Sequence, residues 1–395
     1  MRHPHLHPES APRRPRLAGR AALMTLLVLA LAACGDAPQN VLDPQGPASQ
    51  KPDDLFKIVL IIALVVFLIV QGLIVYAVVK YRDNGDDELP KQVHGNTKLE
   101  LVWTIVPALI LAVIAVPTVK TVFDLAETPD DAMVVEVIGH RWWWEYQYPG
   151  VGPDGTDVVI TANEMVLPTD TDIVLKMTSQ ESGGPANAVI HSYWIPALAG
   201  KQDVVPGRIT TINLTTSGEG VYMGQCTEFC GLSHANMRNY ATVIPQAEFD
   251  AWIAAQLAPA EMPAEGTDAA EGARLFSEMR DVEGLGQRAC VSCHAIAGYV
   301  GPDGGTAAAG VGPNLTHLMD REMFAGSIFD LYQRGEGSWG NWTDVPNEED
   351  LVAWVMDAPS MKAMRATGQN AVGMPNLGLT EQESSQIVAY LLTLR

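Results

Sequence analysis

The sequence predicts a multidomain membrane protein with two transmembrane α-helices, an antiparallel β-sandwich and an all-α C-terminal domain. Three observations predict this class: two long uncharged apolar runs, a region of short β-branched runs separated by turn residues, and helix-capping patterns near the C-terminus. The length of 395 residues suits two or three domains. Charged residues make up 18 %, below the roughly 25 % of an ordinary soluble domain, which also favours membrane segments.

Residues 1–33 have the pattern of a secretory signal peptide, a basic stretch followed by an apolar run from Ala21 to Ala33. The run ends in small residues before Cys34, which resembles the bacterial lipobox, where the cysteine becomes the lipidated N-terminus of the mature chain. The alternative is an ordinary signal peptide with a chance cysteine. Residues 34–54 are then expected to form a periplasmic N-terminal segment.

Two runs are long enough to cross a membrane. Ile58 to Val79 is 22 residues without a charge, and Leu101 to Val119 is 19. At 1.5 Å per residue each covers about 30 Å, one hydrocarbon thickness. We therefore expect transmembrane helices over 55–81 and 99–123, joined by a loop over 82–98. Basic residues in and beside that loop place it in the cytoplasm, so both termini lie outside.

The region 127–257 alternates β-branched runs, such as Met133 to Ile138, with Gly, Pro, Asn and Asp, and this predicts an antiparallel sandwich. A linker is expected over 258–267, which is rich in Pro, Ala and Glu. The region 268–395 is expected to be helical.

Two capping boxes support that helical region: Asp268 with Glu271, and Thr380 with Glu383.

The formal charge of the chain is −21, which argues against nucleic acid as a partner, because phosphate binding needs clustered Lys and Arg. Five cysteines are too few for a disulfide scaffold in a chain of this length, so their spacing indicates chemistry.

Four potential metal ligands lie within twelve residues: Cys226, Cys230, His234 and Met237. Thiolate and thioether sulfurs select copper over magnesium or calcium, and imidazole also suits copper. His191, on the preceding apolar stretch, is the expected further ligand. A disulfide, a zinc site or a buried His191 without metal are the alternatives, but a ligating methionine is unusual for zinc, and the spacing favours copper.

Cys290, Cys293 and His294 form the attachment pattern of a c-type haem, with His294 as the proximal ligand. A thioredoxin-like reading is weaker, because no strand–helix alternation surrounds the motif. The distal ligand is expected among six methionines: Met319, Met323, Met356, Met361, Met364 and Met374. Met374, in a loop before the last helix, is the choice, and His317 is the alternative, although a surface role suits His317 better. Such His/Met ligation raises the potential of a haem iron.

With these motifs the chain resembles subunit II of the haem–copper cytochrome c oxidases, with a cytochrome c domain fused at its C-terminus, the caa-type arrangement. His94, Glu100 and the segment Trp103 to Pro107 match the second-helix pattern of that family. The resemblance implies a cupredoxin-like domain with a binuclear CuA centre and a class I cytochrome c domain.

The resemblance also implies a ligand set for two copper ions. Its members are two bridging thiolates, two imidazoles, a weak thioether and a backbone carbonyl: Cys226, Cys230, His191, His234, Met237 and Glu228. The Glu228 side chain would help to hold a magnesium ion shared with subunit I. Trp142 would be the surface residue at which electrons enter, and the Pro313 carbonyl would accept the hydrogen bond of the haem histidine.

The implied function is electron transfer from cytochrome c, or another periplasmic or membrane donor, through the haem and CuA to subunit I. Subunit I, with haem a and copper B, would reduce oxygen and translocate protons, and no catalytic residue is expected in this chain. Residues 267–395 carry 8 Lys and Arg against 17 Asp and Glu, which predicts attraction to a basic donor. The expected location is the bacterial cell membrane, in contact with the lipid bilayer and other oxidase subunits.

Two other functions stay open at this point. The same relay would also suit a CuA-containing nitric oxide reductase. A membrane-anchored copper-binding or assembly module without turnover is a further alternative, against which the haem motif argues. A quinol oxidase subunit is disfavoured, since that branch lacks these copper ligands.

Overall fold

The computed structural model describes residues 24–25, 38–82, 94–181, 184, 186–335, 341–366, 368 and 371–395. Cys34 and all of the predicted signal peptide except residues 24–25 lie outside the described residues, as does most of the predicted loop 82–98. The chain divides into the units Met1–Pro38 and Gln39–Arg395, and the description below concerns the second unit.

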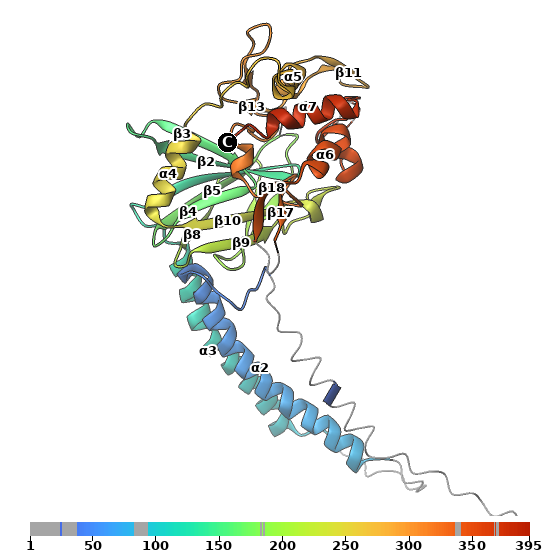
Figure 1. Cartoon of the computed structure of the whole chain (residues 1–395). Coiled ribbons are helices and arrows are strands. Elements are labelled where there is room, and N and C mark those ends of the chain that lie inside the picture. The colour runs from blue at the N-terminus through green and yellow to red at the C-terminus, as the bar shows by residue number, and fades with distance from the viewer. Residues whose placement is uncertain are drawn as a thin grey trace, which may run out of the picture. The chain divides into compact units, whose positions relative to one another are not determined.

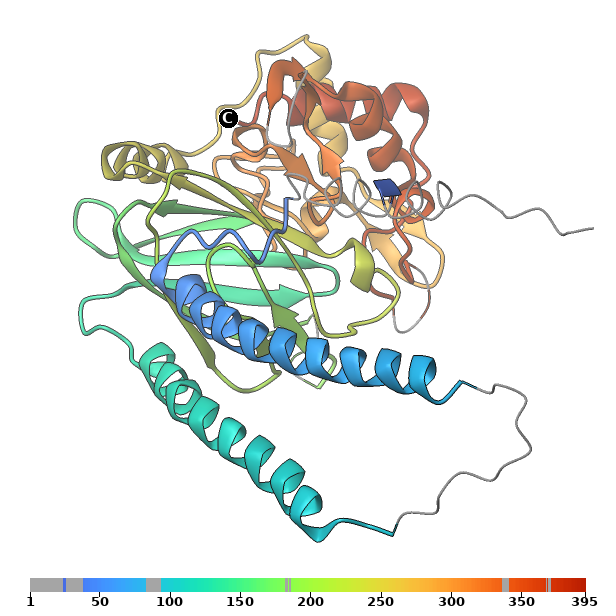
Figure 2. The same cartoon turned by 90° about the horizontal axis from the view of Figure 1, so that it is seen from below.

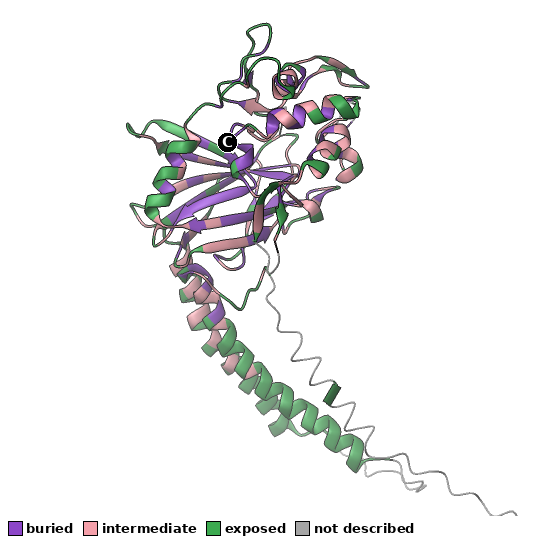
Figure 3. Cartoon of the chain, in the orientation of Figure 1, coloured by how far each residue is buried: buried purple, intermediate pink, exposed green. Residues whose placement is uncertain are grey.

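Two long helices, α2 (Pro47–Lys80) and α3 (Thr97–Ala126), confirm the predicted apolar pair. Both are long and apolar enough to cross a membrane (Figure 1), and their residues are exposed along most of their length (Figure 3). The side chain of Asn96 caps α3 by accepting hydrogen bonds from the N–H groups of Lys98 and Leu99.

The β-sandwich is confirmed. One sheet has the strand order β3-β2-β1-β5-β8 and the other the order β4-β10-β9, and β6 pairs with β7. The bounds are β1 (Met133–His140), β2 (Trp143–Val151), β3 (Asp157–Ala162), β4 (Glu164–Pro168), β5 (Asp172–Ser179), β6 (His191–Tyr193), β7 (Gln202–Val204), β8 (Thr210–Thr215), β9 (Gly220–Gln225) and β10 (Arg238–Ile244). The helix α4 (Gln246–Gln256) follows β10.

The strand pairing corrects the expectation of a purely antiparallel sandwich. β1 pairs with β5 in parallel, and so does β4 with β10. Parallel neighbours need a long crossover, which β2 to β4 supply for the first pair. Fully buried aromatic side chains, among them Trp144 and Tyr146, form the core of this domain.

The C-terminal domain is built around α5 (Asp268–Phe276), α6 (Glu348–Met361) and α7 (Glu381–Leu391) (Figure 1 and Figure 2). Short strand pairs and single 3₁₀ turns join these helices. They are β11 (Arg280–Val282), β12 (Gly286–Arg288), η2 (Cys290–Ser292), β13 (Ala295–Ile296), β14 (Ala307–Ala308), η3 (Leu318–Asp320), β15 (Met323–Phe324), β16 (Phe329–Asp330), β17 (Tyr332–Arg334) and β18 (Trp342–Pro346).

The predicted cap of the last helix is confirmed, because Thr380 and Glu383 form a capping box at the start of α7. The predicted N-cap of α5 lies one residue too far along the chain. Thr267, not Asp268, is the N-cap, since its hydroxyl accepts a hydrogen bond from the N–H of Ala270.

Candidate copper and haem sites

The predicted copper ligands come from two neighbouring places in the sandwich. His191 begins β6, and the others lie on the loop between the paired strands β9 and β10. That loop is closed at its base by a hydrogen bond of 2.8 Å from the N–H of Cys226 to the carbonyl of Met237. A single turn, η1 (His234–Asn236), then directs the His234 ring back toward the cysteines.

The six predicted donor atoms converge. Cys226 Sγ lies 3.8 Å from Cys230 Sγ, 3.9 Å from His191 Nδ1 and 3.3 Å from the carbonyl oxygen of Glu228. Cys230 Sγ lies 3.6 Å from His234 Nδ1 and 3.8 Å from Met237 Sδ. Ligands that share a metal at about 2.0–2.3 Å are themselves about 3–4 Å apart. The spacing therefore fits metal ions placed between these atoms.

The chemistry of the donor set also fits copper. Both cysteines are free and buried, and the soft sulfur and imidazole donors are those that copper prefers. The Cys226 pKa is lowered to about 3, chiefly by the hydrogen bond from Cys230, and for the same reason the pKa of Cys230 is raised. The metal-free pair thus keeps one proton, which a metal would displace. The disulfide alternative is not what the structure contains.

The predicted haem residues line one cavity of about 320 Å³: Cys290, Cys293, His294 and Met374. The Nδ1–H of His294 donates to the carbonyl oxygen of Pro313 at 2.8 Å, so Nε2 is the nitrogen left for iron. Gly312 lies close against the ring, since a Cβ there would lie 2.9 Å from His294 Cε1. An apolar cavity with two thiols and an oriented imidazole fits a c-type haem.

Three of the six candidate methionines line this cavity: Met323, Met364 and Met374. Met323 packs with Tyr240 in a buried cluster between the domains, which is a core role. Met364 lies close to the backbone beside Met374, because a Cβ at Gly373 would fall 2.6 Å from Met364 Sδ. The distal ligand therefore stays a prediction, with Met364 as the competitor of Met374.

The surface role expected for His317 is wrong. The His317 ring is 5 % exposed, and its Nε2 lies 2.9 Å from the carbonyl oxygen of Ala258, at the start of the predicted linker. Ala260 is also buried, with its N–H bonded to Ala297. The first residues of the predicted linker therefore pack onto the C-terminal domain, and Ala258 contacts His317.

Trp142 is not a surface residue in this chain. It is 5 % exposed, its indole N–H donates to the carbonyl oxygen of Cys230 at 3.0 Å, and the side chain lines the haem cavity. The C-terminal domain covers the face on which such a tryptophan was expected to be open. Trp142 therefore contacts the copper loop and borders the haem site at once.

The sandwich contributes further residues to the wall of the haem cavity that the sequence did not predict. Trp143 lines the cavity and stacks on His140, with ring centroids 4.3 Å apart, and Asn163 lines it too. From the C-terminal domain, Lys362 lines the same cavity. No motif marks these residues, because their position depends on how the two domains dock.

The fold and the two donor sets define a membrane-anchored redox protein that combines a copper site with a c-type haem site. Comparison with known families agrees with this class. Residues 37–121 match the family Cytochrome C oxidase subunit II, transmembrane domain, and residues 133–244 match its periplasmic domain. Residues 269–395 match the family Cytochrome c.

Individual relatives cover nearly the whole chain. Cytochrome c oxidase subunit 2 of Alkalihalophilus pseudofirmus is 33 % identical over 389 residues, covering 96 % of this chain and 98 % of that protein. The Bacillus subtilis subunit is 29 % identical over 391 residues, covering 94 % and 96 %. A crystal structure of the periplasmic domain of subunit II from Bradyrhizobium japonicum aligns at 27 % identity and a TM-score of 0.29, covering 33 % of this chain and 96 % of that one. The chain belongs to the cytochrome c oxidase subunit II family and carries a C-terminal cytochrome c domain.

Proposed function

We propose that this chain passes electrons from an external donor, through its cytochrome domain and its copper site, to subunit I of a cytochrome c oxidase. The haem and copper, when bound, supply the one-electron chemistry. The residues of this chain hold those groups in fixed places and connect them. The observation that carries the proposal is the position of Trp142, hydrogen-bonded to Cys230 and exposed to the haem cavity.

The pairing of donors supports two copper ions. Each sulfur has an imidazole of its own, His191 beside Cys226 and His234 beside Cys230. Cys226 and Cys230 would hold the copper ions together with the two imidazoles, and Met237 and the Glu228 carbonyl would be further donors. Because most of these ligands are buried and fixed by the loop, their positions would change little between redox states.

On the haem side, Cys290 and Cys293 would form the thioethers, His294 the proximal bond and Met374 the distal bond.

On the copper side, Glu228 lies both at the copper site and at the protein surface. Its carbonyl faces Cys226 while the residue is exposed. We propose that the Glu228 carboxylate meets subunit I there and contributes to a shared magnesium site, because a carboxylate oxygen is a ligand that magnesium prefers.

The proposed setting is a bacterial plasma membrane, with both large domains on the outer side and an N-terminus processed at Cys34. The proposed partners are subunit I with haem a and copper B, other oxidase subunits, and a cytochrome c or other donor with a basic docking face. The relatives named above are oxidase subunits, so nitric oxide reduction is not favoured. A copper-binding module without turnover is not favoured either, because it needs no cytochrome domain.

The test is rapid reduction of the purified oxidase complex, followed by the absorbance of haem c and of the copper centre. In wild type, haem c should be reduced first and the copper centre should follow. Trp142→Leu should leave donor-to-haem reduction unchanged and slow the haem-to-copper step at least tenfold. Trp252→Leu is the matched control, because Trp252 packs on Tyr148 and Phe249 instead. Copper reduced as fast as haem c by the external donor would contradict the proposed order.

A further inference from the structure

A buried amine joins the two outer domains beside Trp142. Lys362, which directly follows α6 as its C-cap, is 4 % exposed. Its Nζ donates to the carbonyl oxygen of Trp142 at 2.8 Å and to that of Ala325 at 2.7 Å. One side chain of the cytochrome domain therefore bonds a carbonyl of its own domain and a carbonyl of the sandwich.

On one side the backbone at Gly326 lies close to this amine. A Cβ at Gly326 would lie 2.5 Å from Lys362 Nζ, 2.8 Å from the Trp142 oxygen and 2.9 Å from the Asn236 oxygen. The carbonyl of Gly326 in turn accepts the N–H of Arg238 at 2.9 Å. The cytochrome segment 325–327 thus lies directly against the end of the copper loop.

A second contact lies next to the first. The hydroxyl of Ser233, inside the copper loop, donates to the carbonyl oxygen of Ala363. Residues 362 and 363 therefore bind both Trp142 and the copper loop. Since the Trp142 indole also donates to Cys230, Trp142 is held from both sides, by the cytochrome domain at its carbonyl and by the copper loop at its ring.

Burying a lysine side chain at this place costs free energy of folding. Among the described residues no carboxylate forms an ion pair with Lys362, and burial of an unpaired amine costs free energy. Burial lowers the pKa of Lys362 to about 7. Both protonation states keep at least two N–H groups, which is the number that the two carbonyls require. An apolar side chain would fill the space but would leave both carbonyls without a donor.

We propose that Lys362 is a positioning residue for the transfer of electrons between the haem and copper sites. By bonding the Trp142 carbonyl to the cytochrome domain, it fixes the Trp142 ring between the haem cavity and Cys230. This inference rests on the proposed function, since it assigns Lys362 a part in that transfer. It goes beyond that function because Lys362, a residue of the cytochrome domain, holds Trp142 in place.

The experiment compares Lys362→Met with Lys176→Met in the complete oxidase complex. Lys176 is an exposed residue of β5 and serves as the matched control. Lys362→Met should slow the haem-to-copper step at least tenfold, with unchanged haem and copper spectra, and Lys362→Arg, which keeps N–H donors, should recover part of the rate. Hydrogen exchange of residues 324–328 should accelerate in Lys362→Met and stay unchanged in Lys176→Met.

A double variant separates positioning from general stability. If Lys362 acts through Trp142, adding Lys362→Met to Trp142→Leu should slow the step less than twofold further, because the effects of coupled residues are not additive. Full additivity, or an unchanged rate in Lys362→Met with intact spectra, would overturn the inference. If Lys362→Met does not assemble, Gly326→Ala, which displaces the same contact, takes its place with the same expected slowing. Electron transfer from haem to copper in the wild type tests the proposed function by itself, so that function and the role of Lys362 can fail independently.

Discussion

Gly272 of α5 lies directly against the backbone of α7, where a Cβ atom would overlap the carbonyl oxygen of Gln386. Glycine permits this approach because it carries no side chain. The crossing places Phe276 and Ile387 in the core of the cytochrome domain. The fold of that domain therefore depends on the absence of one methyl group.

We expect Gly272→Ala to destabilise the cytochrome domain by about 3 kcal/mol, although alanine is the better helix former. Calorimetric unfolding of the full chain would measure the change in the transition of that domain. Gly310→Ala is the control, because a Cβ at Gly310 meets nothing within 4 Å. An equal effect of both substitutions would show that close helix approach is not the cause.

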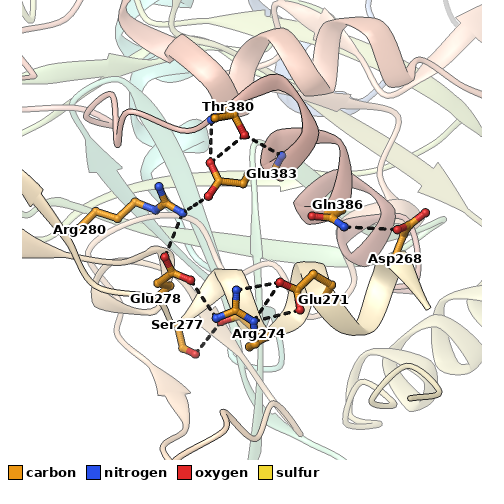
Figure 4. A network of polar contacts seen from close by, with 9 residues as sticks. All are labelled: Asp268, Glu271, Arg274, Ser277, Glu278, Arg280, Thr380, Glu383 and Gln386. Carbon is orange, nitrogen blue, oxygen red and sulfur yellow. Dashed lines mark hydrogen bonds and ion pairs between the residues drawn. The ribbon is translucent and has the colours of Figure 1, made fainter. Parts of the chain in front are cut away.

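The ion pair between Arg280 of β11 and Glu383 of α7 predicts a pH dependence (Figure 4). The Glu383 carboxylate accepts from the Thr380 N–H at 2.8 Å and from Arg280 Nη2 at 2.6 Å. These donors hold the pKa of Glu383 at about 2, below its ordinary 4.5. The stabilisation is thus fully present above pH 4.5 and is lost as the pH falls toward 2.

Glu383→Gln should therefore lower the unfolding temperature of the cytochrome domain at pH 6 and have progressively less effect between pH 4.5 and 2. Thermal unfolding at several pH values measures this difference. Glu381→Gln, in the same first turn of α7, controls for the helix dipole. A wild-type-to-variant difference that is constant with pH would contradict the assigned role of the carboxylate.

The local parts of both sites were predictable from the sequence, and the contacts between domains were not. Cys226, Cys230 and Met237 lie on one short loop, so their proximity follows from their spacing. The hydrogen bond from Trp142 to Cys230 joins residues 88 positions apart, and that from Lys362 to Trp142 joins residues 220 apart. Such contacts depend on domain docking, for which a single sequence carries no periodic signal.

The same limit explains the errors in the fold. Turn residues and β-branched runs predict strands but not their partners, so the parallel pairs β1–β5 and β4–β10 were missed. The burial of His317 was missed because its partner, the carbonyl of Ala258, belongs to a segment that has the composition of a linker. Caps were predictable to within one residue, because capping is local.

The distal haem ligand can be assigned by replacing Met374 and Met364 separately. Met374→Ala should remove the distal sulfur, lower the reduction potential of the haem and open the iron to external ligands, because His/Met ligation raises the potential. Met364→Leu keeps the volume of its side chain and should leave the potential unchanged. Potentiometric titration of haem c in each variant measures this. A lowered potential in Met364→Leu alone would assign the bond to Met364.

The buried Glu164 makes the docked pair of domains sensitive to pH. Its carboxylate accepts from Thr242 Oγ1 at 2.9 Å and from the Tyr240 hydroxyl at 3.1 Å. Burial raises the pKa of Glu164 to about 7, while Arg321 of the cytochrome domain lowers it and Glu322 raises it. The folded chain thus binds this proton more tightly than the unfolded chain does, and stability falls as pH rises from about 4.5 to about 7.

Glu164→Gln removes the charge and keeps a hydrogen-bonding side chain. We expect the variant to be more stable than wild type at pH 8, by up to about 3 kcal/mol, and equal to it near pH 4.5. Denaturant unfolding of the detergent-solubilised chain from pH 4.5 to 8 measures the difference, with the exposed Glu248→Gln as the control. Because Tyr240 also accepts the N–H of Glu322 at 3.0 Å, the stabilisation should appear in the unfolding of both domains together. Parallel stability curves for wild type and Glu164→Gln across this range would show that the carboxyl does not titrate between the domains.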